Sequence, residues 1–201
     1  DGPVIQYSSQ AAINNGVTVS WILDLVSSIR KQSEIPLTLM GYINPILKYG
    51  LNSFLKDAKS ASVDGFIIPD LPPEEAAEYI QLAKKYEISP ILLVAPNSSG
   101  DRIKYISKLA GDLVYCVAIL GITGTNETNF QKLKLYLDKV NRFCQTPFIV
   151  GFGIKTRENI IAINQIAHGA VVGSELIQRQ KNSKDAVKTT FQFISELKGI
   201  K

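Results

Sequence analysis

The sequence predicts an α/β protein whose strands form the parallel sheet of a (β/α)8 TIM barrel, with the first one to two β/α units absent from this chain. Three observations carry this prediction. Short apolar runs alternate with helical stretches along the 201 residues, which is typical of parallel sheets. The runs are continuous rather than alternating, as in strands covered on both faces. The last two runs each break into glycine just before a helix, as in phosphate-binding barrels.

Each predicted strand is a short run of apolar or β-branched residues, and no linker, low-complexity tract or composition shift divides the chain. We therefore expect one domain over residues 1–201. By periodicity and repeat length alone, an open doubly wound sheet would fit as well as a barrel. The strands are expected at residues 36–41, 64–69, 90–95, 112–118, 147–151 and 168–173.

The helices between the runs are indicated by apolar stripes at helical spacing, which we expect to face the core. Start signals agree, since Pro72 and Pro73 precede two glutamates and Thr156 opens the helix after a glycine junction. The stripes are Val19, Ile22, Leu23, Val26 and Ile29; then Phe130, Leu133, Leu137 and Val140; then Val187, Phe191, Ile194 and Leu197.

The number of strands is smaller than a closed barrel requires. Six runs are visible, whereas this kind of barrel has eight strands in about 250 residues. The chain also begins without methionine in a stretch typical of a loop, Asp1-Gly2-Pro3-Val4. We therefore expect an N-terminally incomplete chain that lacks about fifty residues, or two units of this repeat.

Composition excludes several classes of protein. No apolar run approaches the ~20 residues of a membrane span, so a soluble protein in the cytoplasm or a plastid stroma is expected. The net charge of +4 comes from lysines and arginines scattered along the chain, which argues against nucleic-acid binding and suits a small phosphorylated ligand. Cys116 and Cys144 have no metal-type spacing to other ligands, so neither a disulfide nor a metal is expected.

Two glycine junctions mark a candidate phosphate site. Gly151-Phe152-Gly153-Ile154-Lys155 and Val171-Val172-Gly173-Ser174-Glu175 each lead from a strand into a helix. The first amides of a helix lack intrahelical partners and carry the positive end of the helix dipole, and glycine lets an anion approach them closely. A pair of such junctions in the last two β/α units predicts a phosphate cradle.

Six stretches in order along the chain resemble the α subunit of tryptophan synthase. They are Asp1-Gly2-Pro3-Val4-Ile5-Gln6, Gly41-Tyr42-Ile43-Asn44-Pro45, the run from Ile68 to Glu75, Gly121-Ile122-Thr123-Gly124, Gly151-Phe152-Gly153-Ile154 and Gly173-Ser174.

The resemblance implies the retro-aldol cleavage of indole-3-glycerol phosphate to indole and glyceraldehyde 3-phosphate. It makes Asp1 the catalytic carboxylate at the indole nitrogen and Thr123 the residue of a lid that closes on it. The family's second carboxylate, a glutamate on a preceding strand, has no counterpart in these 201 residues, so we expect this fragment to be inactive. It also implies no cofactor in this subunit and a β-subunit partner, in an α2β2 complex, that carries pyridoxal phosphate.

The resemblance assigns the remaining site residues by function. Phosphate is expected on the backbone of Gly124, Phe152, Gly153, Gly173 and Ser174, with the Ser174 hydroxyl as a further donor. The indole slot is expected between Phe152, Tyr115, Met40, Ile67 and Val171. Asp70 is expected to support the site, and Tyr42 and Asn44 to lie at supporting or β-subunit-facing positions.

Two alternatives stay open at this stage. Another phosphate-binding barrel, such as a phosphoribosyl isomerase or indole-glycerol-phosphate synthase, would share the two glycine junctions. A non-catalytic partner that only activates a β subunit would share the motifs without the glutamate.

Overall fold

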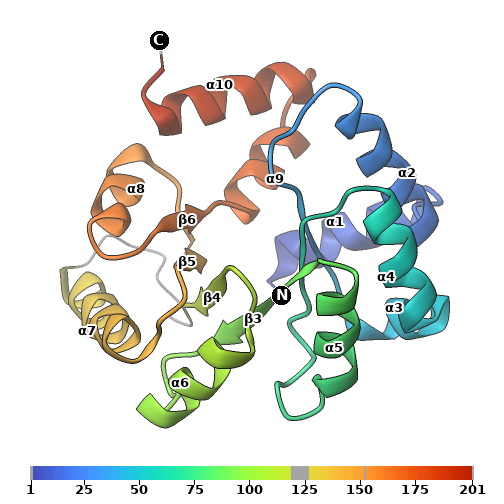
Figure 1. The fold of residues 1–201 in the computed structure, drawn as a ribbon. Helices are drawn as coiled ribbons and strands as arrows, with labels where there is room; N and C mark the ends of the chain where they lie inside the picture. Colours follow the sequence, from blue (N-terminus) through green and yellow to red (C-terminus); the bar gives the residue numbers. More distant parts are fainter. Residues whose placement is uncertain (1, 119–126, 152, 201) are drawn as a thin grey trace.

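The computed structural model describes residues 2–118, 127–151 and 153–200 and shows a curled parallel sheet with helices around it (Figure 1). The strands are β1 (Thr38–Met40), β2 (Gly65–Ile67), β3 (Ser89–Val94), β4 (Val114–Val117), β5 (Phe148–Gly151) and β6 (Gly169–Val171). The helices are α1 (Pro3–Asn14), α2 (Val19–Arg30), α3 (Ile43–Tyr49), α4 (Leu51–Ser60), α5 (Ala77–Lys85), α6 (Gly100–Leu109), α7 (Glu127–Phe143), α8 (Arg157–Asn164), α9 (Ser174–Lys181) and α10 (Ala186–Lys198).

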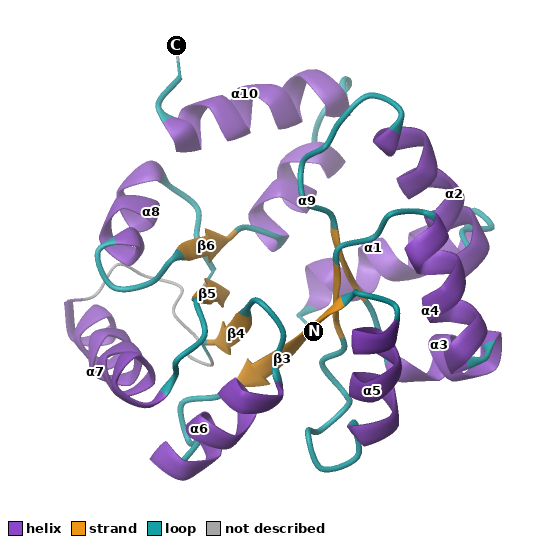
Figure 2. Ribbon diagram, viewed as in Figure 1, coloured by secondary structure: helices purple, strands orange, loops and turns teal. Residues whose placement is uncertain are grey.

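The six strands lie side by side in chain order, β1-β2-β3-β4-β5-β6, and every pairing is parallel. This topology confirms the predicted sheet, and each strand falls inside its predicted run except β3, which starts one residue earlier. The strands are shorter than the apolar runs because the ladder stops where the chain leaves for the next helix. Figure 2 shows the strands at the centre and the helices outside them.

The core lies between the sheet and its helices, where outward-facing strand residues such as Phe148, Val150 and Val114 pack with the helix stripes. The stripe predicted for α7 is confirmed at Leu133, Leu137 and Val140, which are buried. Phe130, at the start of that stripe, stays partly exposed.

The core stripe predicted for α10 is wrong at its first half. Val187 is 81% exposed and Phe191 73% exposed, whereas Phe193 and Leu197 are buried. Helix α10 packs on α9 and α8, so it turns a different face inward than a helix lying on a strand would. On α2, Leu23 and Val26 are buried, but Ile29 is exposed.

The curled sheet has two edges, β1 and β6, and no strand pairing joins them within the described residues. Helix α1 packs against α9 near this opening. Unpaired strand edges can pair with other chains, and exposed apolar side chains favour association.

We expect the 201-residue chain to associate at micromolar concentration, because both the open edges and the apolar face of α10 attract a second copy. Sedimentation velocity should show the sedimentation coefficient rising with concentration. Phe191→Lys should weaken this association, whereas Gln192→Lys, on the same exposed helix, serves as the charge-matched control. A monomer at every concentration with a cooperative thermal melt would contradict the prediction.

Candidate active site

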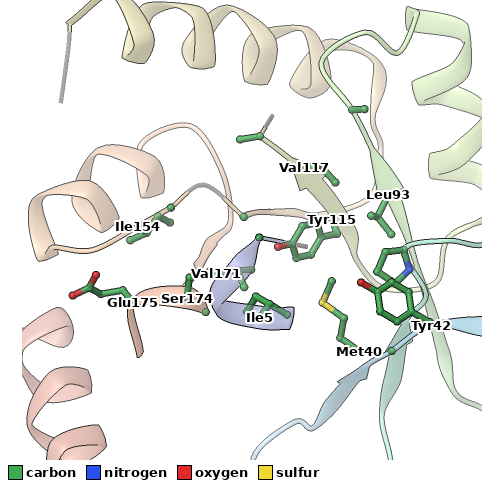
Figure 3. A pocket seen from close by; sticks show the side chains of 18 of the residues that line it. Ile5, Met40, Tyr42, Leu93, Tyr115, Val117, Ile154, Val171, Ser174 and Glu175 are labelled. Carbon is green, nitrogen blue, oxygen red and sulfur yellow. The ribbon is translucent and has the colours of Figure 1, made fainter. Parts of the chain in front are cut away.

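A cavity of about 1130 Å³ opens at the carboxyl ends of the strands. Five of the strands each contribute a lining residue from their carboxyl end: Met40, Leu93, Val117, Gly151 and Val171. Parallel strands bring their carboxyl ends to one edge of the sheet, so residues far apart in sequence meet there. Figure 3 shows the side chains of this region converging from the sheet, from α1 and from the start of α9.

One wall of the cavity is apolar and built around Tyr115. The Tyr115 ring points into the cavity from β4, near Met40 and Val171 and opposite Ile5 of α1 (Figure 3). Burial raises the pKa of the Tyr115 phenol above its ordinary value, so its hydroxyl stays protonated at neutral pH. An apolar wall with one polar tip suits a flat aromatic ligand.

The position of the Tyr115 ring depends on Gly151. A Cβ at position 151 would lie 2.6 Å from Tyr115 Cζ, far inside van der Waals contact. Gly151 of β5 pairs with Val117 of β4, two residues beyond Tyr115 on the same strand. Because Gly151 has no side chain, the Tyr115 ring can lie across its backbone.

Gly151→Ala is therefore expected to displace the Tyr115 ring and to destabilise the fold by about 1–3 kcal/mol, the usual cost of overpacking. The double change Gly151→Ala with Tyr115→Leu should recover most of that loss, because the smaller side chain frees the space. Urea unfolding of the unchanged chain and of these two variants measures both effects. Equal stability of Gly151→Ala and the unchanged chain would show that the ring is not confined by Gly151.

The two glycine junctions differ in whether their helix amides are available. At α8, Thr156 Oγ1 accepts from the Asn159 N–H at 3.4 Å, and Asn159 Oδ1 accepts from the N–H groups of Lys155 and Thr156 at 3.3 Å each. This capping box satisfies the N–H groups of Lys155, Thr156 and Asn159 with side chains of the same segment, so fewer amides at the start of α8 remain for a ligand.

Helix α9 has no such cap. Gly173 is its N-cap residue and provides no side-chain hydrogen bond. Gly173 and Ser174 are exposed and line the cavity. The first amides of α9 therefore lack an internal side-chain acceptor, so this helix start is the stronger anion site of the two. Gly153 also lines the cavity and has a φ of 52°, a left-handed conformation that favours glycine.

The loops beyond β1 and β2 are tied together at the cavity rim. Asp70 Oδ1 accepts from the Ile43 N–H at 3.0 Å, which fixes the first turn of α3. Tyr42 lines the cavity directly before this turn, and Asn44 is exposed within it. A negatively charged acceptor at a helix start is also favoured by the helix dipole.

The structure brings most of the described site predictions to one cavity. Seven of the predicted residues line it: Met40, Tyr42, Tyr115, Gly153, Val171, Gly173 and Ser174. Figure 3 shows Ser174 and Val171 toward one side of the view and Met40 and Tyr42 toward the other. Asp1, Thr123, Gly124 and Phe152 lie outside the described residues.

Ile67 is buried and is not among the described residues that line the cavity. Its partner on β3 is Ile91, which precedes the cavity-lining Leu93 by two residues. On the other side, Ile67 is level with Met40 of β1, which does line the cavity, so strand register alone does not decide which residues reach it.

Sequence reasoning missed several lining residues. Ile5 and Ser9 come from α1, and their contribution depends on how that helix packs across the opening, which no local pattern reveals. Leu93 and Ala95 could have been found, since they end a predicted strand at the same edge as Tyr115. Asn97 and Ser98 follow that strand directly and line the cavity as well.

The described residues form neither a metal site nor a membrane-spanning helix. No group of three or more histidine, cysteine, aspartate or glutamate side chains is arranged to hold a metal ion. None of the described helices has the length and apolar character needed to cross a membrane.

The curled parallel sheet, with its cavity at the carboxyl ends of the strands, defines a (β/α)-barrel protein with a ligand site at the usual face of that fold. Comparison with known proteins narrows this class. The chain belongs to the tryptophan synthase α chain family, because the family model described as "Tryptophan synthase alpha chain" matches residues 1–200.

Individual relatives agree with the family assignment. The tryptophan synthase alpha chain of Petrotoga mobilis is 42% identical, over 94% of this chain and 73% of that protein. The one from Thermoanaerobacter sp. is 41% identical, over 100% of this chain and 77% of that protein.

Solved structures are similar over the whole chain. One is a tryptophan synthase complex from Pyrococcus furiosus, with a TM-score of 0.90 and 32% identity, covering 100% of this chain and 81% of that one. Another from the same organism, with a TM-score of 0.89 and 33% identity over the same shares, is described as showing mutual activation of the α2β2 complex.

Proposed function

We propose that this chain binds indole-3-glycerol phosphate and serves the α reaction of tryptophan synthase, the cleavage to indole and glyceraldehyde 3-phosphate. The observation that carries the proposal is the pairing, across one cavity, of the uncapped α9 start with the apolar wall around Tyr115. A phosphate on the α9 amides would leave the indole ring against that wall. Membership of the family supports the same reaction.

The cleavage reaction requires two acid/base groups. Protonation of the indole carbon that bears the glycerol chain makes the ring nitrogen electron-poor, and a carboxylate accepting the N–H stabilises this charge. We assign that function to Asp1, with Thr123 as the lid residue that closes over it. Removal of the hydroxyl proton then lets the carbon–carbon bond break, which yields indole and the aldehyde.

A second carboxylate for these proton transfers is not evident among the described lining residues. Glu175 is the one carboxylate there, and it is held by Arg179 Nε at 3.1 Å. It lies at the start of α9, on the phosphate side of the proposed site. We therefore infer that residues 1–201 alone bind ligands but cleave the substrate slowly or not at all.

A β subunit is the proposed partner, with pyridoxal phosphate bound in that partner and no cofactor in this chain. The P. furiosus α2β2 complex among the similar structures supports this partner. The exposed Tyr42 and Asn44, at the same end of the sheet as the cavity, are the proposed β-facing positions. The bacterial sources of the relatives favour the cytoplasm as the compartment.

Ligand binding and indole release together test the proposal. Isothermal titration should show that the 201-residue chain binds both glycerol 3-phosphate and indole, and that each still binds when the other is present. Adding a β subunit should show whether the chain activates it, which is the function of a non-catalytic partner. If neither ligand binds at millimolar concentration, the proposed function is wrong.

A further inference from the structure

Three charged side chains among the described residues line the cavity, and two of them are neutralised. Arg102 is held by Glu74 through two hydrogen bonds, of 2.5 and 3.2 Å. Glu175 is held by Arg179 at 3.1 Å, and the Arg179 guanidinium also lies 4.0 Å from the centre of the Phe193 ring. The third charged side chain is Lys155.

Lys155 has no carboxylate within ion-pair distance in the part of the chain that the structure describes. Its side chain is exposed, whereas the preceding Ile154 is buried. Its backbone is fixed, because its N–H donates to Asn159 Oδ1 at 3.3 Å in the capping box of α8. The lysine therefore combines an anchored backbone with a side chain that is free to turn toward an anion.

Lys155 lines the same cavity as Ser174 and Glu175 at the start of α9. Figure 3 shows its neighbour Ile154 on the same side of the view as Ser174 and Glu175. Glu175 places an acidic group in the first turn of that helix. Arg179 offsets this charge, but the pair adds nothing attractive for a dianion. An ammonium group beside the α9 amides would supply the net positive charge that the Glu175–Arg179 pair lacks.

We propose that Lys155 is a phosphate-binding residue of this site, in which its ammonium group contacts the phosphate held by the α9 amides. This inference rests on the proposed function and adds a side-chain cation to a site otherwise built from the backbone. It predicts a specific contribution to phosphorylated ligands and none to the indole ring. A lysine is a mobile point charge, so it can follow the phosphate without fixing its orientation.

Titration of the 201-residue chain with glycerol 3-phosphate and, separately, with indole tests the proposal. Lys155→Gln should weaken glycerol 3-phosphate binding by roughly two- to fivefold, the upper part of the range for a solvent-exposed ion pair. Indole affinity should not change, and Lys155→Arg should keep most of the phosphate affinity. The loss should shrink in about 0.5 M salt, which screens exposed charges.

Lys188→Gln is the matched control, since it removes the same charge from α10 outside the cavity-lining residues. Equal phosphate affinity of Lys155→Gln and Lys188→Gln would overturn the inference and leave the proposed function intact. An unchanged chain that binds no glycerol 3-phosphate would instead contradict the proposed function. Lys155→Ala, with its melting temperature, provides a second variant if the glutamine protein does not fold.

Discussion

Gly173→Asp is expected to weaken glycerol 3-phosphate binding at least about a hundredfold while leaving the melting temperature unchanged or raised. Aspartate is a preferred N-cap residue, so its carboxylate would accept hydrogen bonds from the same α9 N–H groups that we assign to the phosphate. There is space for the side chain, because a Cβ at Gly173 meets nothing within 4 Å, and capping requires ψ at this position to move from −81° to the extended range of N-cap residues. Two like charges about 4 Å apart also repel by up to ~4 kcal/mol near a protein surface.

Gly173→Asn separates the effect of helix capping from the effect of the added negative charge. Asparagine caps the helix in the same way but carries no charge, so it should weaken phosphate binding less than aspartate does. Isothermal titration gives the affinities and differential scanning calorimetry gives the melting temperatures. Wild-type phosphate affinity in Gly173→Asp would show that the anion does not lie on the α9 start.

Phe148→Ala is expected to lower the free energy of unfolding by about 3–5 kcal/mol, enough to unfold a marginally stable domain. Phe148 is 1% exposed on β5, and its ring packs edge-on against His168 with 5.3 Å between ring centres. Removing the ring leaves a cavity in the core between the sheet and its helices. Urea unfolding followed by circular dichroism measures the loss.

Phe130→Ala is the matched control for that variant. Phe130 is 38% exposed at the start of α7, so the same change removes much less buried surface there. We expect a loss of about 1 kcal/mol or less. If the two variants lost equal stability, the core would not be where the structure places it.

The strands and their order could be predicted from sequence because both depend on local signals. Each strand is a continuous apolar run, and parallel strands joined by helices pair with their neighbours along the chain. The glycine junctions were visible for the same reason. Thr156 was visible as a helix start, but the second half of its capping box was not, since it depends on whether the Asn159 side chain turns back to Lys155 and Thr156 or faces solvent.

The features that the sequence did not reveal depend on long-range packing. The apolar side chains of Val187 and Phe191 have helical spacing, but which face of α10 turns inward depends on α8 and α9. Ile5 enters the cavity because α1 packs beside α9. Ile67 is not among the described lining residues although its β1 partner Met40 is, a difference that no local pattern reveals.

A crystal of the 201-residue chain soaked with glycerol 3-phosphate tests the central claim most directly. The claim is that the uncapped start of α9 is the anion site of the cavity. We predict phosphate density within hydrogen-bond distance of the Ser174 and Glu175 N–H groups, with the glycerol end directed toward Tyr115. An anion bound at the start of α8 or elsewhere on the surface, with none at α9, would contradict the account.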